Sequence, residues 1–397
     1  MKIKTLALIV MAVGLQWLAG CGGGGGDDAG GGIGGTGSPL GTLRLSLTDA
    51  PACGYDAVNI TVERIRVHQS DGAADDDGGW HDIVLQPARR VDLLSLTNGV
   101  LLELGEVALP AGRYTQLRLV LAGNGGATPL ANSVVPTGGN ETALDTPSAQ
   151  QSGLKLKANI DVPAGKVVDF VLDFDACKSV VKRGNSGKYN LKPVVAVIPL
   201  LSDAGLRVIG YVAPSIASGA TSVSVQASGT PVKATAPDAN GLFVLYPVPV
   251  GSYTLVVSAP GRVTAVITGV PVVDTAQTLV NTSALPIDPP PATLRPVAGT
   301  VTPTEASVRA LQTLSGGPVV EMAWAPVDAL SGAFAFALPI EAPVRTSFPA
   351  IGPFSLGFSA DAAAAGRYTI EAAMGGAVKT QAIDVNGAVA PLSFSLP

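Results

Sequence analysis

The chain has 397 residues, of which 47% are apolar and only 14% are charged, and its formal net charge is −5. This length allows two or three domains, and the lack of a basic stretch argues against nucleic acid as a partner. Glycine and proline are abundant, with 48 and 31 residues, and long apolar patterns of helical period are nearly absent. The composition therefore predicts an all-β protein built of small sandwiches.

The N-terminus has the three parts of a secretory signal. Lys2 and Lys4 supply positive charge, the apolar run that ends at Leu18 is too short to span a bilayer, and small residues precede Cys21. We expect a cleaved signal peptide at residues 1–20, which leaves a mature net charge of about −7.

Residues 21–40 are mostly glycine and predict a flexible tether, because glycine has no side chain to bury. The sequence Leu18-Ala19-Gly20-Cys21 resembles the lipobox of bacterial lipoproteins, which implies that Cys21 is the first mature residue and carries the lipid. Gly22, where an aspartate would favour the inner membrane, implies the outer membrane without indicating which face. The alternative is a free thiol in a soluble secreted protein.

The first domain is predicted at residues 41–203 and consists of alternating strands. Leu43–Leu47 places every second residue on an apolar face, and Leu117–Leu121 does the same. Within Val58–Val67 the apolar positions change parity, which predicts a β-bulge near Glu63.

Two later segments of this domain, 154–160 and 168–174, also alternate. Pro163-Ala164-Gly165 between them predicts a three-residue hairpin loop, with Gly165 in the left-handed conformation. That hairpin would bring Lys155 opposite Asp173, an exposed pair that favours the register.

After Cys21, the chain contains only two further cysteines, Cys53 and Cys177. In an exported protein such a pair predicts one disulfide, worth about 4–5 kcal/mol in the chain-entropy model. The chain has too few cysteines and histidines for a typical metal centre, so no cofactor is expected.

The loop Asp71–Gly79 is acidic, and Asp71, Asp75 and Asp77 are the candidate ligands for a Ca²⁺ ion. Calcium loops alternate their carboxylates, whereas Asp75, Asp76 and Asp77 are contiguous and point apart. The pattern favours a solvated acidic loop.

Residues for catalysis are few. His68 and His81 have no paired histidine or nucleophile motif nearby, which favours structural or surface roles. Asp173, Asp175 and Asp82 are the carboxylates that a polysaccharide-acting enzyme would use as acid and base. The sequence favours a protein without catalytic residues, and the enzyme is the alternative.

Several motifs of the first domain together resemble the bacterial domain of unknown function 4382 (DUF4382). The family is uncharacterised, so the resemblance implies a fold unit and no activity. The motifs are Ser46–Pro51, Trp80, Leu109–Tyr114, Gln151–Lys155, Asp173–Ala176 and Leu191–Val194.

The second domain is predicted at residues 204–288, with a turn at Pro237–Gly241. Segments such as Asn240-Gly241-Leu242-Phe243 and Gly251-Ser252-Tyr253-Thr254 resemble carboxypeptidase-regulatory-like and collagen-adhesin B-type repeats. That resemblance implies a prealbumin-like sandwich that acts as a spacer. Its short strands are expected at Val208–Val212, Ser222–Ala227, Leu242–Leu245, Tyr253–Ser258 and Val263–Ile267.

A proline run after Asp288 predicts a stiff break before a third, degenerate sandwich at residues 289–397, in which Asp361–Ala365 is a possible helical turn. The motif Gly-x-Tyr-Thr occurs at 112–115, 251–254 and 366–369. We interpret it as a turn into a core-facing tyrosine.

The sequence thus predicts an immunoglobulin-like or prealbumin-like multi-domain chain, anchored by lipid to the outer membrane of a bacterial envelope. We expect a non-enzymatic protein whose first domain binds a glycan or an envelope or surface protein through the loops 71–79 and 123–151. Alternatives are an enzyme or enzyme-associated factor acting on polysaccharide, and a purely structural envelope protein.

Overall fold

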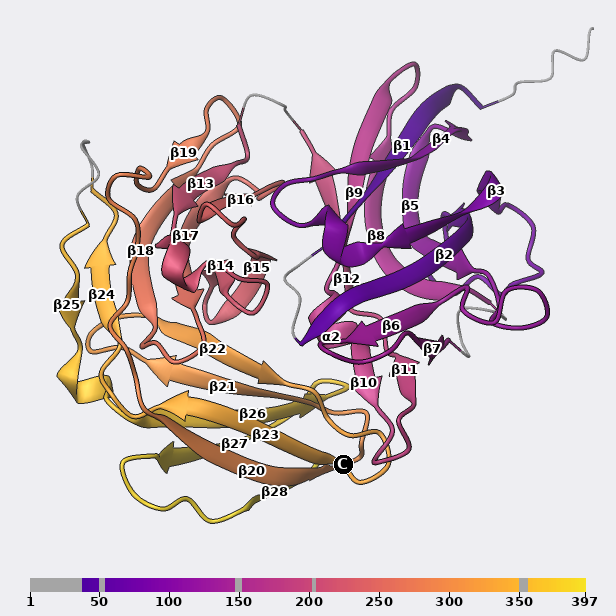
Figure 1. Ribbon diagram of the computed structural model, residues 1–397. Coiled ribbons are helices and arrows are strands. Elements are labelled where there is room, and N and C mark those ends of the chain that lie inside the picture. Colours follow the sequence, from indigo (N-terminus) through magenta and orange to yellow (C-terminus); the bar gives the residue numbers. More distant parts are fainter. Residues whose placement is uncertain (1–37, 50–53, 147–151, 202–204, 350–355) are drawn as a thin grey trace, which may run out of the picture. The chain divides into compact units, whose positions relative to one another are not determined.

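The computed structural model describes residues 38–49, 54–146, 152–201, 205–349 and 356–397 (Figure 1). Nearly all its regular elements are strands, arranged in several separate sheets, so the predicted all-β fold class is confirmed. Residues Pro39–Pro397 form one compact unit. Within the described residues, no helix has the length and apolar character needed to cross a bilayer.

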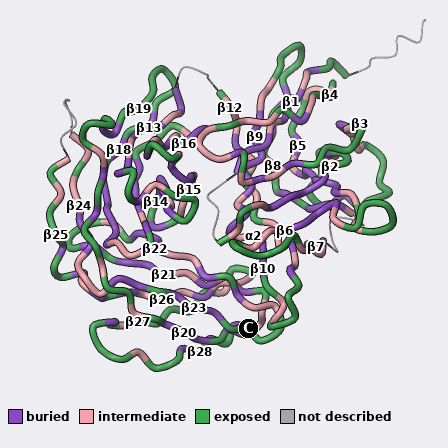
Figure 2. The backbone as a smooth tube through the Cα atoms, in the orientation of Figure 1, coloured by how far each residue is buried: buried purple, intermediate pink, exposed green. Residues whose placement is uncertain are grey.

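Three hydrophobic cores organise this unit, and buried residues follow the inward faces of the strands around them (Figure 2). We call the parts of the chain around these cores the first module (residues 40–200), the second module (206–287) and the third module (294–396). The sheets bury their apolar faces against one another, as in sandwiches.

The first module contains a four-stranded and an eight-stranded sheet. The four-stranded sheet has the order β12 (Val195–Leu200), β9 (Val167–Phe174), β1 (Leu40–Asp49) and β4 (Leu102–Pro110). The other sheet comprises β2 (Tyr55–His68), β3 (His81–Asp92), β5 (Gly112–Leu121), β6 (Ser133–Pro136), β7 (Thr142–Asp145), β8 (Leu154–Val162), β10 (Val180–Lys182) and β11 (Tyr189–Leu191). The short helices are η1 (Leu93–Leu96) and α2 (Ala176–Ser179).

The alternation in these strands matches the observed burial. Leu43, Leu45 and Leu47 of β1 are fully buried. The predicted bulge is also present, because the register of β2 with both β3 and β5 shifts between Val62 and Arg64. One extra residue there returns the next apolar side chains to the core.

The predicted hairpin of β8 and β9 is wrong. β8 pairs with β5, whereas β9 pairs in parallel with β1 and antiparallel with β12, so the two strands belong to different sheets. Lys155 therefore lies opposite Arg118 and not opposite Asp173. Gly165 does have a positive φ of 68°. An alternating pattern says which side chains face the core, but it is the same for a hairpin and for a crossover between two sheets.

The segment 123–151, expected as one long loop, contains strands β6 and β7. β6 pairs with β2 and β7 pairs with both β6 and β11, so these strands extend the larger sheet. Each has only four residues, too few for a clear period.

The second module has sheets ordered β16-β13-β19 and β15-β14-β17-β18-β24-β25, and the third has β23-β20-β28 and β22-β21-β26-β27. The strands of the second module are β13 (Val208–Tyr211), β14 (Ser222–Ala227), β15 (Thr230–Thr235), β16 (Leu242–Leu245), β17 (Gly251–Ser258), β18 (Ala265–Val272) and β19 (Thr278–Leu279), with η2 at Pro214–Ile216. The strands later in the chain, of which β24 and β25 join a sheet of the second module, are β20 (Leu294–Thr302), β21 (Ser307–Thr313), β22 (Val319–Ala325), β23 (Ala333–Pro339), β24 (Val344–Ser347), β25 (Ser359–Ala360), β26 (Arg367–Met374), β27 (Ala377–Asp384) and β28 (Leu392–Ser395), with η3 at Ala362–Ala364.

Two connections bind these modules together. β24, which follows the first strands of the third module, pairs in parallel with β18 of the second. The proline run also packs on the second module, because the Val263 N–H donates to Pro290 and the Ala292 N–H donates to Gly261. The run is therefore part of the compact unit and not a free-standing spacer.

The three Gly-x-Tyr-Thr motifs place their tyrosines in the three cores, as predicted. Tyr114, Tyr253 and Tyr368 are buried, and each phenol donates a hydrogen bond to a proline carbonyl at 2.7–2.9 Å. In the first two motifs the acceptor lies four residues earlier, at Pro110 and Pro249, so each tyrosine fixes the turn that precedes its strand.

Candidate functional site

Some predicted site residues lie outside the described residues. Cys21 and Cys53 are among them, so lipid attachment and the Cys53–Cys177 disulfide stay predictions. Cys177 itself is buried in α2.

The candidate calcium ligands Asp75 and Asp77 are bonded to other groups of the protein. Asp75 forms an ion pair with Arg118, and the Asp77 carboxylate accepts a hydrogen bond of 2.8 Å from the Ala74 N–H. Among the residues that the structure describes, no group of three or more His, Cys, Asp or Glu side chains is placed to hold a metal ion. The loop folds onto a buried arginine because a guanidinium in the core needs acceptors.

Trp80 is the centre of this folded loop. The guanidinium carbons of Arg66 and Arg118 lie 4.7 and 4.6 Å from its ring centroid, which is the geometry of cation–π contacts. Its indole N–H donates to the Ala74 carbonyl at 2.8 Å, and the ring of His68 lies 5.0 Å away. We call these four side chains with Asp75 the Trp80 cluster. Its members are engaged with one another, which is consistent with the structural role expected for His68.

The three candidate acid–base carboxylates are not brought together. Asp82 pairs with Arg66 at 3.0 Å on β3, and Asp173 forms an ion pair with Lys233 of the second module. Asp175 precedes α2, where it accepts a hydrogen bond of 3.0 Å from the Lys178 N–H. Of the three, only Asp175 lines a cavity described below. His81 lies edge-on to the ring of Tyr114.

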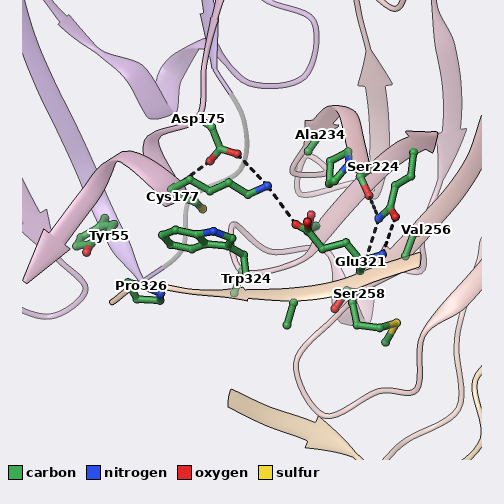
Figure 3. A pocket seen from close by; sticks show the side chains of 17 residues that line it. Tyr55, Asp175, Cys177, Ser224, Ala234, Val256, Ser258, Glu321, Trp324 and Pro326 are labelled. Atoms are coloured by element: carbon green, nitrogen blue, oxygen red, sulfur yellow. Dashed lines mark hydrogen bonds and ion pairs between the residues drawn. The ribbon is translucent and has the colours of Figure 1, made fainter. Parts of the chain in front are cut away.

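A cavity of about 280 Å³ lies where the three modules meet (Figure 3). A second cavity of about 420 Å³ has Lys178, Glu321 and Trp324 in common with it. These three side chains therefore form the partition between the two cavities. The first cavity takes its polar lining from all three modules, through Asp175, Lys178, Ser224, Gln226 and Glu321.

The charged side chains at the partition are paired with one another. The Lys178 ammonium lies 3.1 Å from one oxygen of Glu321 and 3.7 Å from Asp175. The other oxygen of Glu321 lies 3.3 Å from Arg309, whose Nε donates to Glu371 at 2.7 Å. Burial raises the pKa of Asp175, and the neighbouring Lys178 opposes that rise. We call Asp175, Lys178, Glu321, Arg309 and Glu371 the inter-module charge chain.

A buried amide holds this chain in place. The Gln226 side chain donates to the Glu321 carbonyl and accepts from the Glu321 N–H, both at 2.8 Å. Both residues are almost fully buried, so the pair fixes β22 of the third module against β14 of the second. Satisfied buried polar groups of this kind define one packing arrangement, because any other would leave them unpaired.

Trp324 differs from Trp80. It is half-buried at the end of β22, and Figure 3 shows its indole beside the ion pairs that join Asp175 to Glu321. Its ring contacts no aromatic or cationic group of the described residues at cation–π or stacking distance, and its N–H has no hydrogen-bond partner among them. It is a large amphipathic surface that faces both cavities.

The sequence did not single out Trp324, Glu321 or Gln226. The available signal was weak: Glu321 is a charged residue between apolar neighbours in Val319–Ala325. A buried position for it requires partners, and two of these, Lys178 and Gln226, come from segments up to 143 residues earlier in the chain.

The family match falls on the first module. Residues 40–193 match the family model described as a domain of unknown function, DUF4382, as the motifs predicted. A search of curated proteins found no match.

Similar solved structures include two interface mutants of a type II cohesin–X-dockerin complex from Acetivibrio cellulolyticus. The N-terminal interface mutant is 27% identical over 22% of this chain and 60% of that chain, with a TM-score of 0.20. The C-terminal interface mutant is 31% identical over 21% of this chain and 56% of that chain, with a TM-score of 0.18. The chain therefore spans less than two thirds of the length of either.

Proposed function

We propose that this protein is a non-enzymatic, lipid-anchored binding protein of the bacterial outer membrane. In this proposal Cys21 carries the lipid and residues 22–37 are the tether between the membrane and the folded part of the chain. Residues 39–397 act together as one binding unit. The carboxypeptidase-regulatory-like modules are then walls of the binding site and not spacers behind a separate head.

The observation that carries the binding role is the arrangement at the cavities. Each carboxylate of the inter-module charge chain lies against a lysine or arginine, and Trp324 is left facing the open space. A general acid must be free to transfer its proton to a substrate, whereas each of these carboxylates is engaged in an ion pair. This geometry supports retention of a ligand better than proton transfer.

A second candidate function is hydrolysis of a polysaccharide, and one observation favours it. Asp175 and Glu321 line the same cavity, and burial raises the pKa of Asp175. The Lys178 ammonium between the two carboxylates favours the binding role instead. Incubation with an oligosaccharide, followed by mass spectrometry, separates the two, because only hydrolysis shortens the chains.

The anchor is tested by fractionating a double-membrane bacterium that expresses the full chain. Cys21→Ser should move the protein from the membrane to the soluble fraction and abolish incorporation of labelled palmitate. Gly22→Ala is the matched control and should leave both properties unchanged. Membrane retention and acylation of Cys21→Ser would refute the anchor.

A further inference from the structure

We propose that the two cavities at the inter-module charge chain form a binding site for an uncharged sugar chain, with Trp324 as the stacking surface. This inference rests on the binding role proposed above for residues 39–397, but it does not depend on the lipid anchor. Three independent features of the site lead to it.

The first feature is shape. The cavities have volumes of about 280 and 420 Å³, near the lower end of the range for small-molecule sites, and they lie on the two sides of a shared partition. A ligand built of repeating small units can place one unit in each cavity. A single compact ligand would use only one of them.

The second feature is charge. Three acidic side chains (Asp175, Glu321 and Glu371) and three basic ones (Lys178, Lys192 and Arg309) line the two cavities. Five of these side chains already pair with one another in the inter-module charge chain, whereas Lys192 donates to the Glu305 carbonyl. A charged ligand that engaged one of the paired groups would compete with its ion pair, and leaving the other member uncompensated in a partly buried site is costly. An uncharged ligand can hydrogen-bond to the same groups without breaking their pairing.

The third feature is the combination of hydroxyl groups and an aromatic face. Ser222 and Ser258 are directly opposite each other on β14 and β17, so both hydroxyls lie on the same face of the sheet, and both line the smaller cavity. Tyr55 lines the same cavity and supplies a third hydroxyl, which is protonated at neutral pH as tyrosine ordinarily is. Such groups both donate and accept hydrogen bonds.

Trp324 completes the match. An indole presents a flat apolar face and a single N–H donor, and in this protein the Trp324 side chain lines both cavities. A sugar ring has one face of C–H groups and a rim of hydroxyls, so it can cover the indole and bond to the serines, the tyrosine and the paired carboxylates. Few other uncharged ligands present both surfaces together.

The test uses the acylated mature protein in detergent micelles and isothermal titration with defined hexamers. The neutral probes are maltohexaose, cellohexaose and chitohexaose, and the charged probes are hexagalacturonic acid and hexaglucosamine. We expect at least one neutral hexamer to bind, and both charged hexamers to bind at least tenfold more weakly. Failure of every neutral hexamer to bind with a Kd below about 1 mM would overturn the sugar site.

Variants locate the binding. Trp324→Ala should weaken binding of the neutral hexamer by tenfold or more, and Trp324→Phe, which keeps a flat ring, should weaken it less. Leu330→Ala removes an exposed apolar side chain outside both cavities and should bind like the wild type. Unchanged binding by Trp324→Ala would overturn the assignment. If that variant does not fold, the double variant Ser222→Ala/Ser258→Ala replaces it, and unchanged binding by the double variant would overturn the assignment.

The outcome for the sugar site is distinguishable from that for the proposed function. Shortened hexamers after incubation would refute the non-enzymatic role while supporting a sugar site. Loss of the sugar site with intact Cys21-dependent membrane retention would refute this inference alone.

Discussion

Two clusters of this protein contain a tryptophan, cations and carboxylates, and they use them differently. In the Trp80 cluster, Arg66 and Arg118 lie against the indole and the N–H is bonded to Ala74. At the inter-module charge chain, Lys178 and Arg309 pair with carboxylates. Among the described residues, Trp324 has no cation–π contact and its N–H has no hydrogen-bond acceptor. The same residue types therefore give a closed structural cluster in one place and an available aromatic surface in the other.

The reason lies in the origin of the partners. Trp80 follows the loop that folds over it, and its arginines come from adjacent strands of one sheet, β2 and β5. The partners of Glu321 come from three modules, whose strand ends meet without filling the space between them. A local cluster can close completely, whereas a junction of separate cores leaves cavities.

The largest effect is expected where the junction is most deeply buried. Lys233 and Asp173 join the second module to the first, with side chains that are 1% and 10% exposed. Lys233→Met should lower the free energy of unfolding by about 3–5 kcal/mol, because Asp173 is left buried without its cation. Denaturant unfolding measures this, and Asp173→Leu/Lys233→Met should recover most of the loss. A change below about 1 kcal/mol would show that the pair does not hold the junction.

The comparison itself is tested by removing each tryptophan. Trp80→Ala should cost about 2 kcal/mol, since it removes two cation–π contacts with arginines and the hydrogen bond to the Ala74 carbonyl. Trp324→Ala should cost about 1 kcal/mol or less, because its ring already faces open space. Chemical denaturation of both variants measures the difference. Equal losses would mean that Trp324 is as structural as Trp80.

The pH dependence sharpens the comparison further, through Asp175. Burial raises its pKa in the folded protein, although Lys178 opposes the rise, so the folded state binds this proton more readily than the unfolded state does. Its contribution to the free energy of unfolding should therefore increase as the pH falls through the raised pKa, by at most about 1.4 kcal/mol per pH unit.

The measurement is denaturant unfolding of the wild type and Asp175→Asn at pH 7, 6 and 5. Asparagine keeps the acceptor that caps α2, so the variant isolates the titration. The stability advantage of the wild type should grow towards pH 5. An advantage that shrinks instead would show that Asp175 is held ionised by the charge chain.

The smallest effect is expected for an ion pair that belongs to neither cluster. Arg44 and Asp169 pair on adjacent strands β1 and β9, with side chains 43% and 28% exposed. Arg44→Ala should leave the midpoint of thermal unfolding unchanged within error, because water screens such a pair. A clear decrease would mean that exposed pairs also stabilise the sheet, and it would weaken the contrast with Lys233.

Local patterns in the sequence correctly predicted much of the fold. Alternation identified the inward faces of β1, β5 and β9, the change of parity identified the bulge in β2, and the tyrosine motif identified a contact in each core. These features depend on residues a few positions apart, so their physical cause is contained in a short segment.

Tertiary structure alone decided which strands are neighbours and which charges meet. The hairpin of β8 and β9 was wrong because a period of two does not specify a partner strand. Asp173 was expected opposite Lys155 but pairs with Lys233 of another module, and Trp324 gained its place only when three cores packed together. The free energy of such contacts depends on burial and on groups distant in the chain, and the local sequence determines neither of them.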